Sequence, residues 1–370
     1  MRVALVHDWL TGMRGGERVL EQLCLLHPEA DIFTLLYVPG SVGRIIEGHR
    51  IFVSFLDRLP KRGYRHYLPL YPLAIESLDL SGYDLVLSTS HAVAKGCRPP
   101  PGAVHVAYIH TPMRYVWDQF DAYFGPGRAG AVTRFAAHAV APMLRLWDVR
   151  STRRAHALIA NSRFVADRIR RHWGRETDFV VYPPVDTARF VPAAEGPSPE
   201  DYALVVSALA PYKRIERAVS AFSRLKRPLW IVGDGPERGR LEEAAGSTVR
   251  FLGSVGQDEL PRLYAGARFF VLPGEEDFGI AAVESQAAGR PVLALGRGGV
   301  LETVVDGETG VFFDQPTVES LLDGVGRIDR LQVDPIRIHE HARRFDGGRF
   351  APELQRAIES CVERARRSFI

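Results

Sequence analysis

Glu276 and Glu284 are the residues of this chain whose side chains most suggest a chemical role, because they are two carboxylates that stand eight positions apart. Glu276 follows the apolar strand-like run Phe269–Leu272, and Glu284 falls about one and a half turns into a helix that Gly279 opens. In a parallel α/β sheet, such a loop and helix start lie at the carboxyl edge of the strand, where ligands bind. Both carboxylates can therefore face one ligand and hold its two ends.

The helix that carries Glu284 has an apolar stripe of Ile280, Val283 and Ala287, which we expect to pack on the sheet. Glu284 would then be partly buried and would need a polar partner, such as the two hydroxyls of a ribose. Glu276 would remain for a second group of the ligand. The alternative is an ordinary acidic helix start, stabilised by the helix dipole.

Lys213 supplies a cation in the segment Ser207–Arg214, after the expected strand Ala203–Ala208 and before the expected helix Ile215–Leu225. An ammonium there could reach a diphosphate. Cations are disfavoured at helix N-termini, and a bound anion would relieve that conflict. The alternative is a solvated lysine.

Two glycine-containing loops could bring backbone N–H groups close to a phosphate. Gly15 and Gly16 lie between the first strand and the first helix, and Gly233 begins the turn Gly233–Pro236 after another strand. Neither loop matches the dinucleotide fingerprint GxGxxG. Each is also compatible with a tight turn that has no chemical role.

His110 ends the expected strand Val104–His110, and His91 follows the run Asp84–Ser88. An imidazole at a strand end can face a ligand or act as a structural group. We expect His110 to contribute to the site and rank His91 below it.

Strand-like and helical runs alternate along the chain, which predicts an α/β fold with parallel sheets and helices on both faces. The expected strands are Arg2–His7, Asp31–Leu36, Asp84–Ser88, Val104–His110, Ala157–Ala160, Phe179–Tyr182, Ala203–Ala208, Leu229–Gly233, Val249–Gly253, Phe269–Leu272, Val292–Leu295 and Val311–Phe313. The predicted organisation is an N-terminal Rossmann-like domain at 1–186, a linker at 187–200, a C-terminal Rossmann-like domain at 201–346, and a terminal helical segment at 347–370 that packs back on the first domain.

Composition narrows the class of protein. The 370 residues are 46% hydrophobic and 25% charged, with a net charge of +3 that gives no reason to expect nucleic acid. Three separated cysteines predict neither disulfides nor a zinc site. We see no transmembrane run and no signal peptide, and expect a cytoplasmic protein.

The segment Arg44–Tyr67 has six Lys/Arg residues, mixed with Phe52, Phe55, Leu56, Tyr64 and Tyr67. Basic side chains with exposed aromatics suit an anionic membrane surface, so a peripheral association is one interpretation. The other is a solvated surface above core aromatics.

Taken together, these motifs resemble family 4 of the retaining glycosyltransferases, particularly bacterial mannosyltransferases that build cell-surface polysaccharides. The resemblance covers nearly the whole chain, and the Glu276/Glu284 spacing is its most specific element. It also includes His7–Leu10, Gly15-Gly16, Ser88–Gly96, His110–Tyr115, Ala160–Ser162, Tyr182–Asp186, Pro211–Arg214 and Gly233–Pro236.

The resemblance implies the GT-B fold, with two Rossmann-like domains facing across a cleft, and a nucleotide-sugar donor. Glu284 would bind the ribose, Glu276 the donor hexose and Lys213 the diphosphate, with His110 near the transferred sugar. The other donor-binding positions would be Gly15, Gly16, Arg214, Gly233, Gly279 and Ile280. Retention of configuration would use a front-face route, and we expect no cofactor and no metal because the cleft segments lack an Asp-x-Asp element.

One position departs from the family pattern. Relatives commonly carry an arginine five positions before the lysine, and here that position is Ala208. Arg214 or Arg14 could replace the missing cation.

The expected donor is GDP-mannose and the expected acceptor a glycan or lipid-linked oligosaccharide. The alternatives are a nucleotide-sugar epimerase or phosphorylase of the same fold, or a non-catalytic sugar- or lipid-binding scaffold. A nicotinamide-dependent dehydrogenase is disfavoured by the missing GxGxxG.

Overall fold

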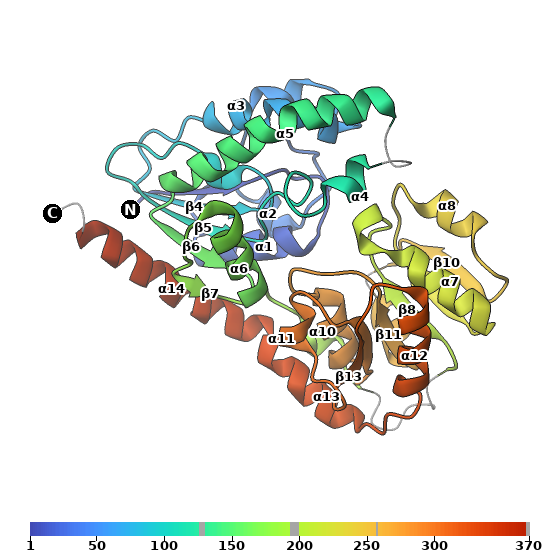
Figure 1. Cartoon of the computed structure of the whole chain (residues 1–370). Coiled ribbons are helices and arrows are strands. Elements are labelled where there is room, and N and C mark those ends of the chain that lie inside the picture. Colours follow the sequence, from blue (N-terminus) through green and yellow to red (C-terminus); the bar gives the residue numbers. More distant parts are fainter. Residues whose placement is uncertain (126–129, 193–199, 257, 368–370) are drawn as a thin grey trace. The chain divides into compact units, whose positions relative to one another are not determined.

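The computed structural model describes residues 1–125, 130–192, 200–256 and 258–367. The chain divides into two compact units, one formed by Met1–Pro183 with Phe350–Ile370 and the other by Pro184–Arg349 (Figure 1). Of the expected linker, residues 193–199 lie outside the described residues, as do 368–370 of the terminal segment.

The first unit contains a parallel sheet in the order β3-β2-β1-β4-β5-β6-β7. Its strands are β1 (Val3–His7), β2 (Asp31–Thr34), β3 (Ile51–Val53), β4 (Leu85–Ser90), β5 (Val104–Ile109), β6 (Ala157–Ala160) and β7 (Phe179–Val180). The central strands β4 and β5 are buried on both faces along their whole length, and their sequences are mainly apolar apart from Ser88, Thr89, Ser90 and His105.

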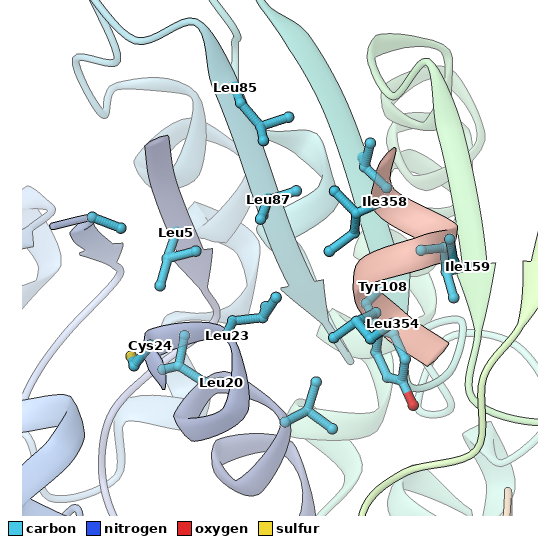
Figure 2. Packing of buried hydrophobic residues seen from close by; sticks show 14 of the residues in the cluster. Leu5, Leu20, Leu23, Cys24, Leu85, Leu87, Tyr108, Ile159, Leu354 and Ile358 are labelled. Atoms are coloured by element: carbon cyan, nitrogen blue, oxygen red, sulfur yellow. The ribbon is translucent and has the colours of Figure 1, made fainter. Parts of the chain in front are cut away.

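Helices cover both faces of this sheet. They are α1 (Gly15–Leu26), α2 (Arg44–Glu47), α3 (Tyr71–Glu76), α4 (Phe120–Phe124), α5 (Ala131–Ser151), α6 (Arg163–Trp173) and α14 (Gly347–Arg367), with the 3₁₀ turns η1 (Phe55–Arg58), η2 (Tyr64–Leu70), η3 (Ala94–Gly96) and η4 (Thr152–Arg154). One cluster of buried residues joins α1 and α14 to the sheet, where Leu354 and Ile358 pack near Tyr108 and Ile159 (Figure 2). A second cluster joins η2, α3, η3 and α5 to strands β1, β2 and β4.

The second unit contains a parallel sheet in the order β10-β9-β8-β11-β12-β13. Its strands are β8 (Ala203–Val206), β9 (Leu229–Val232), β10 (Val249–Gly253), β11 (Phe269–Leu272), β12 (Val292–Leu295) and β13 (Gly310–Phe313). Its helices are α7 (Ile215–Leu225), α8 (Arg238–Glu243), α9 (Leu260–Gly266), α10 (Ile280–Ala287), α11 (Val300–Thr303), α12 (Val318–Ile328) and α13 (Pro335–Ala342), with η5 (Thr187–Arg189), η6 (Pro211–Lys213) and η7 (Arg343–Phe345).

Every strand-like run of the sequence contains a strand, and the α/β architecture of two parallel sheets is confirmed. Strand β3 was not predicted, because Ile51–Val53 is only three residues long and lies among basic residues. In the segment Arg44–Tyr67, for which the sequence left two interpretations open, Leu56 is fully buried, whereas Phe52 and Phe55 are exposed.

Candidate functional site

Each sheet has one place where the strand order reverses, and loops that leave this point define a crevice at the carboxyl edge. In the first unit the reversal lies between β1 and β4, and in the second between β8 and β11. The loops after these four strands contain most of the chemistry-bearing residues that the sequence singled out.

In the second unit, Lys213 and Glu276 form an ion pair between the loops after β8 and β11. Their side chains are only 17% and 11% exposed. The Gly299 N–H donates to the Glu276 carbonyl at 2.8 Å and holds this loop against the one that follows β12. The structure therefore brings together two residues to which the family resemblance assigns separate roles.

Glu284 lies on α10, and its carboxylate accepts a hydrogen bond of 2.8 Å from the Tyr264 hydroxyl of α9. Tyr264 is fully buried, and burial together with the Glu284 charge raises its pKa well above the ordinary value. Glu284 is half-buried, as predicted. The expected apolar stripe was partly wrong, because Ile280 is only half-buried and the buried face is instead made by Ala282, Val283, Ser285, Gln286 and Ala287. Sequence reasoning missed Tyr264.

At two positions of the second unit, the backbone conformation or a close neighbouring atom favours glycine over any residue with a side chain. Gly279 is the N-cap of α10 with φ +95°, a left-handed conformation that favours glycine. Gly233 has φ +122°, and a Cβ there would lie 2.0 Å from the Ser207 carbonyl oxygen. The hydrogen bonds of α10 begin with the N–H groups of Ala282 and Val283, which both donate to the Gly279 carbonyl, so the N–H groups of Ile280 and Ala281 precede this ladder and can meet a ligand.

A group of arginines lies near Lys213. Arg217, in the first turn of α7, donates from Nη1 to the Pro273 carbonyl at 3.0 Å, directly after β11. Burial, together with the charges of Arg214 and Arg297, lowers the pKa of its guanidinium. Arg214 itself has a left-handed φ of 56° and lies 3.8 Å from Glu216. Neither Arg217 nor Arg297 belongs to a recognisable sequence motif, so neither was predicted as a site residue.

In the first unit, the buried carboxylate of Asp8 organises the loop after β4. It accepts four backbone N–H groups, those of His91, Ala92, Val93 and Ala94, at 2.6–2.9 Å. The His91 imidazole lies 3.2 Å from the same carboxylate. Burial alone would raise the pKa of Asp8, but the two neighbouring histidines and these N–H donors lower it overall.

His7, Glu17 and His110 complete this cluster. His7 Nδ1 lies 2.6 Å from the Thr89 hydroxyl, and His7 Nε2 is 3.7 Å from a carboxylate oxygen of Glu17. A Cβ added to Gly16 would lie 3.5 Å from the His7 ring and 3.6 Å from His110 Nε2. The expected Gly15-Gly16 loop and His110 are therefore adjacent.

His110 is neutral at physiological pH. Burial, followed by the charges of His91 and His7, lowers its pKa to about 3. Among the described residues, its Nε2 atom is buried without a hydrogen-bond partner. A neutral imidazole can donate or accept one hydrogen bond to a polar ligand. In the part of the chain that the structure describes, no group of three or more His, Cys, Asp or Glu residues is placed to hold a metal ion.

Two protein-family models match successive parts of the chain. The model described as Glycosyltransferase Family 4 matches residues 13–189, and the model described as Glycosyl transferases group 1 matches residues 188–345. Together they span both units.

Curated relatives match over part of the chain. A GDP-mannose-dependent alpha-(1-6)-phosphatidylinositol monomannoside mannosyltransferase of Mycolicibacterium smegmatis is 32% identical over 48% of this chain and 53% of its own length. A D-inositol 3-phosphate glycosyltransferase of Streptomyces avermitilis is 34% identical over 42% of this chain and 40% of its own. The alignments thus span about half the length of these relatives, or less.

Solved structures share the fold. Sucrose-phosphate synthase from Thermosynechococcus elongatus superposes with a TM-score of 0.74 at 18% identity, covering 98% of this chain and 100% of its own. Anabaena HepE in complex with UDP-glucose gives a TM-score of 0.69 at 17% identity, covering 97% and 100%.

Proposed function

We propose that this chain, which belongs to family 4 of the glycosyltransferases and has the GT-B fold, transfers a hexose from a nucleotide-sugar to a glycan or lipid-linked acceptor. The observation that carries the proposal is the pairing of Lys213 with Glu276 at the carboxyl edge of the second sheet, on a loop that leads directly into the helix that contains Glu284. One cation and two carboxylates match the diphosphate and the hydroxyls of such a donor.

In this proposal Glu284, oriented by Tyr264, accepts hydrogen bonds from the ribose hydroxyls. Glu276 faces the hydroxyls of the hexose, and Lys213 moves from its pair with Glu276 to the leaving diphosphate. The first N–H groups of α10 add donors for the phosphate oxygens. The similarity to GDP-mannose-dependent relatives supports GDP-mannose as the donor, with mannose as the transferred sugar and GDP as the nucleotide.

Retention at the anomeric carbon would follow a front-face route, in which the leaving phosphate accepts the proton of the attacking hydroxyl. In such a reaction the protein must stabilise the charge that develops on the diphosphate and must position the acceptor. The roles of His110, Gly15 and Gly16 toward the sugar, and the independence from metal and cofactor, remain predictions from the family resemblance.

We assign the cation missing at Ala208 to Arg217. Because β8 and β11 are neighbours, the Pro273 carbonyl that binds Arg217 lies beside the loop that contains Ala208. The charges of Arg214 and Arg297 repel the Arg217 guanidinium. A bound diphosphate would relieve this repulsion. Arg214 and Arg14 are the competing candidates.

The assignment of Arg217 is tested by measuring the affinity for GDP and for guanosine. Arg217→Gln should weaken GDP binding by about tenfold and leave guanosine binding unchanged. Arg224→Gln is the matched control on the same helix, because Arg224 is exposed and pairs with Glu319. If only Arg214→Ala or Arg14→Ala weakened GDP binding, Arg217 would not be the substitute.

The proposed activity is tested first by thermal stabilisation with GDP-, UDP-, ADP- and dTDP-sugars, for the wild-type chain and for Glu284→Ala. We expect one nucleotide class to stabilise the wild type and the variant to lose that shift. Transfer from the selected donor to lipid-linked acceptors is then measured. Absence of any shift would favour a non-catalytic scaffold, and donor turnover without acceptor would favour an epimerase.

A further inference from the structure

Helix α5 has an inner face that is buried and an outer face that is apolar yet exposed. On the inner face, Leu144 is buried and the Trp147 indole donates to Glu76 of α3 at 2.6 Å. On the outer face, the exposed fractions are 84% for Val132, 78% for Phe135, 54% for Met143 and 51% for Leu146. Their spacing, with exposed Ala139 between them, places these side chains in one stripe along the helix.

Two more exposed leucines lie on elements next to α5. Leu70 at the end of η2 and Leu73 on α3 are 42% and 62% exposed. Helix α3 lies beside the C-terminal part of α5, where the Trp147 indole donates to Glu76, and Arg154 of η4, directly after α5, pairs with the same carboxylate at 2.7 Å (Figure 1). We call the six residues Leu70, Leu73, Val132, Phe135, Met143 and Leu146 the α5 ridge. Soluble monomers rarely expose large contiguous apolar patches unless these bind something.

Cations predominate around the α5 ridge. Residues 58–73 contain three arginines and a lysine and no acid, and Arg62 and Arg65 are exposed. Residues 130–154 contain five arginines, and their one acid is Asp148. Asp148 is fully buried, pairs with Lys95 at 2.8 Å and accepts hydrogen bonds from two tryptophan indoles. Lys61 and Arg154 pair with Asp57 and Glu76, which lie just outside these two segments, whereas the segments themselves contribute no acid to the surface.

We propose that the α5 ridge inserts at the boundary between headgroups and acyl chains of an anionic lipid bilayer. An apolar helix face bordered by exposed arginines is the pattern of a helix that lies in a membrane interface, with cations on anionic headgroups. A second copy of the chain is a poorer occupant, because a two-fold contact would bring together the arginine-rich segments of both copies, and the neighbouring acids Asp57 and Glu76 are already paired with Lys61 and Arg154. The ridge thus differs from the segment Arg44–Tyr67 that the sequence indicated, and shares only its basic end.

Binding to vesicles tests the ridge directly. Phosphatidylcholine vesicles with and without phosphatidylglycerol are sedimented with the wild-type chain and with Phe135→Ser combined with Leu146→Ser. We expect the wild type to prefer the anionic vesicles and the double variant to bind them at least about tenfold more weakly. The control, Leu301→Ser combined with Ile336→Ser, removes two apolar residues of the second unit that are 55% and 44% exposed, and should bind like the wild type.

A probe on the ridge reports insertion. The three native cysteines, Cys24, Cys97 and Cys361, are buried, so Phe135→Cys can be labelled selectively with an environment-sensitive dye. The emission of this dye should shift to the blue with anionic vesicles, whereas a dye at Leu301→Cys should not respond. Equal binding by the ridge variant and the wild type, or equal binding to neutral and anionic vesicles, would overturn the proposal. A ridge-dependent dimer without vesicle binding, seen by light scattering, would also overturn it. These readouts do not depend on transferase activity.

Discussion

The ammonium of Lys213 and the carboxylate of Glu276 neutralise each other at the carboxyl edge of the second sheet, between the loops that follow β8 and β11. Both side chains are largely buried, so each charge depends on the other for stabilisation. In the proposed reaction the two residues bind different parts of the donor, and donor binding must therefore exchange this pair for two contacts with the ligand.

A double-mutant cycle measures this dependence. Lys213→Ala leaves the Glu276 carboxylate unpaired and should lower the free energy of unfolding by about 2 kcal/mol. Adding Glu276→Gln should restore part of the loss, giving a coupling energy of about 1–2 kcal/mol in urea unfolding. Additive effects of the two substitutions would contradict the pairing.

Tyr264 is predicted to orient Glu284. Tyr264→Phe removes the 2.8 Å hydrogen bond and should weaken nucleotide binding about fivefold, because roughly 1 kcal/mol of positioning is lost. Isothermal titration with GDP gives the readout. Tyr202→Phe is the control, since the Tyr202 hydroxyl donates to the Leu263 carbonyl at 2.7 Å and not to Glu284. Equal GDP affinities for the two variants would refute the role of Tyr264.

Two glycine substitutions should separate function from folding. Gly16→Ala adds a methyl at ordinary contact distance from His7 and His110, so stability should change by less than about 1 kcal/mol. Transfer activity should nevertheless fall at least about tenfold, because the methyl occupies space beside His110 Nε2. Gly233→Ala would place a Cβ 2.0 Å from the Ser207 carbonyl oxygen and should unfold readily. Melting curves and a transfer assay on both variants test this difference. A stable and fully active Gly16→Ala chain would exclude Gly16 from the site.

Acid should destabilise the first unit through buried histidines. Burial lowers the pKa of both His105 and His110 to about 3 in the folded chain. As the pH falls, the histidines of the unfolded chain bind protons before those of the folded chain. The contribution of each neutral histidine to the free energy of unfolding is therefore complete above about pH 6.5 and is lost as the pH falls toward 3.

At about pH 5 the loss should be roughly 2 kcal/mol for each histidine relative to neutral pH. His105→Gln should reduce the pH dependence by about that amount, measured by urea unfolding with tryptophan fluorescence. Four of the five tryptophans, Trp9, Trp117, Trp147 and Trp173, belong to the first unit, so the signal reports mainly on it. An unchanged pH dependence in His105→Gln would mean that this ring is not held neutral by burial.

The amino-acid sequence alone was enough to predict the α/β architecture and the loops that form the candidate site. Parallel strands that are buried on both faces appear as short apolar runs, and the polar residues directly after such runs fall at the carboxyl edge wherever the strands pair. That reasoning found Lys213, Glu276, Glu284 and His110. It missed β3, where Ile51–Val53 is too short to stand out among basic residues.

The contacts between these residues could not be predicted from the sequence, because they depend on tertiary packing. The pairing of Lys213 with Glu276 requires β8 beside β11, and strand order depends on packing between segments far apart in the chain. The contact of Tyr264 with Glu284 and the four N–H groups on Asp8 are likewise non-local. The exposure of the apolar stripe on α5 could not be predicted either. Apolar residues at helical spacing look the same in the sequence whether the helix face is buried or exposed. The two cases differ only in whether neighbouring elements cover that face.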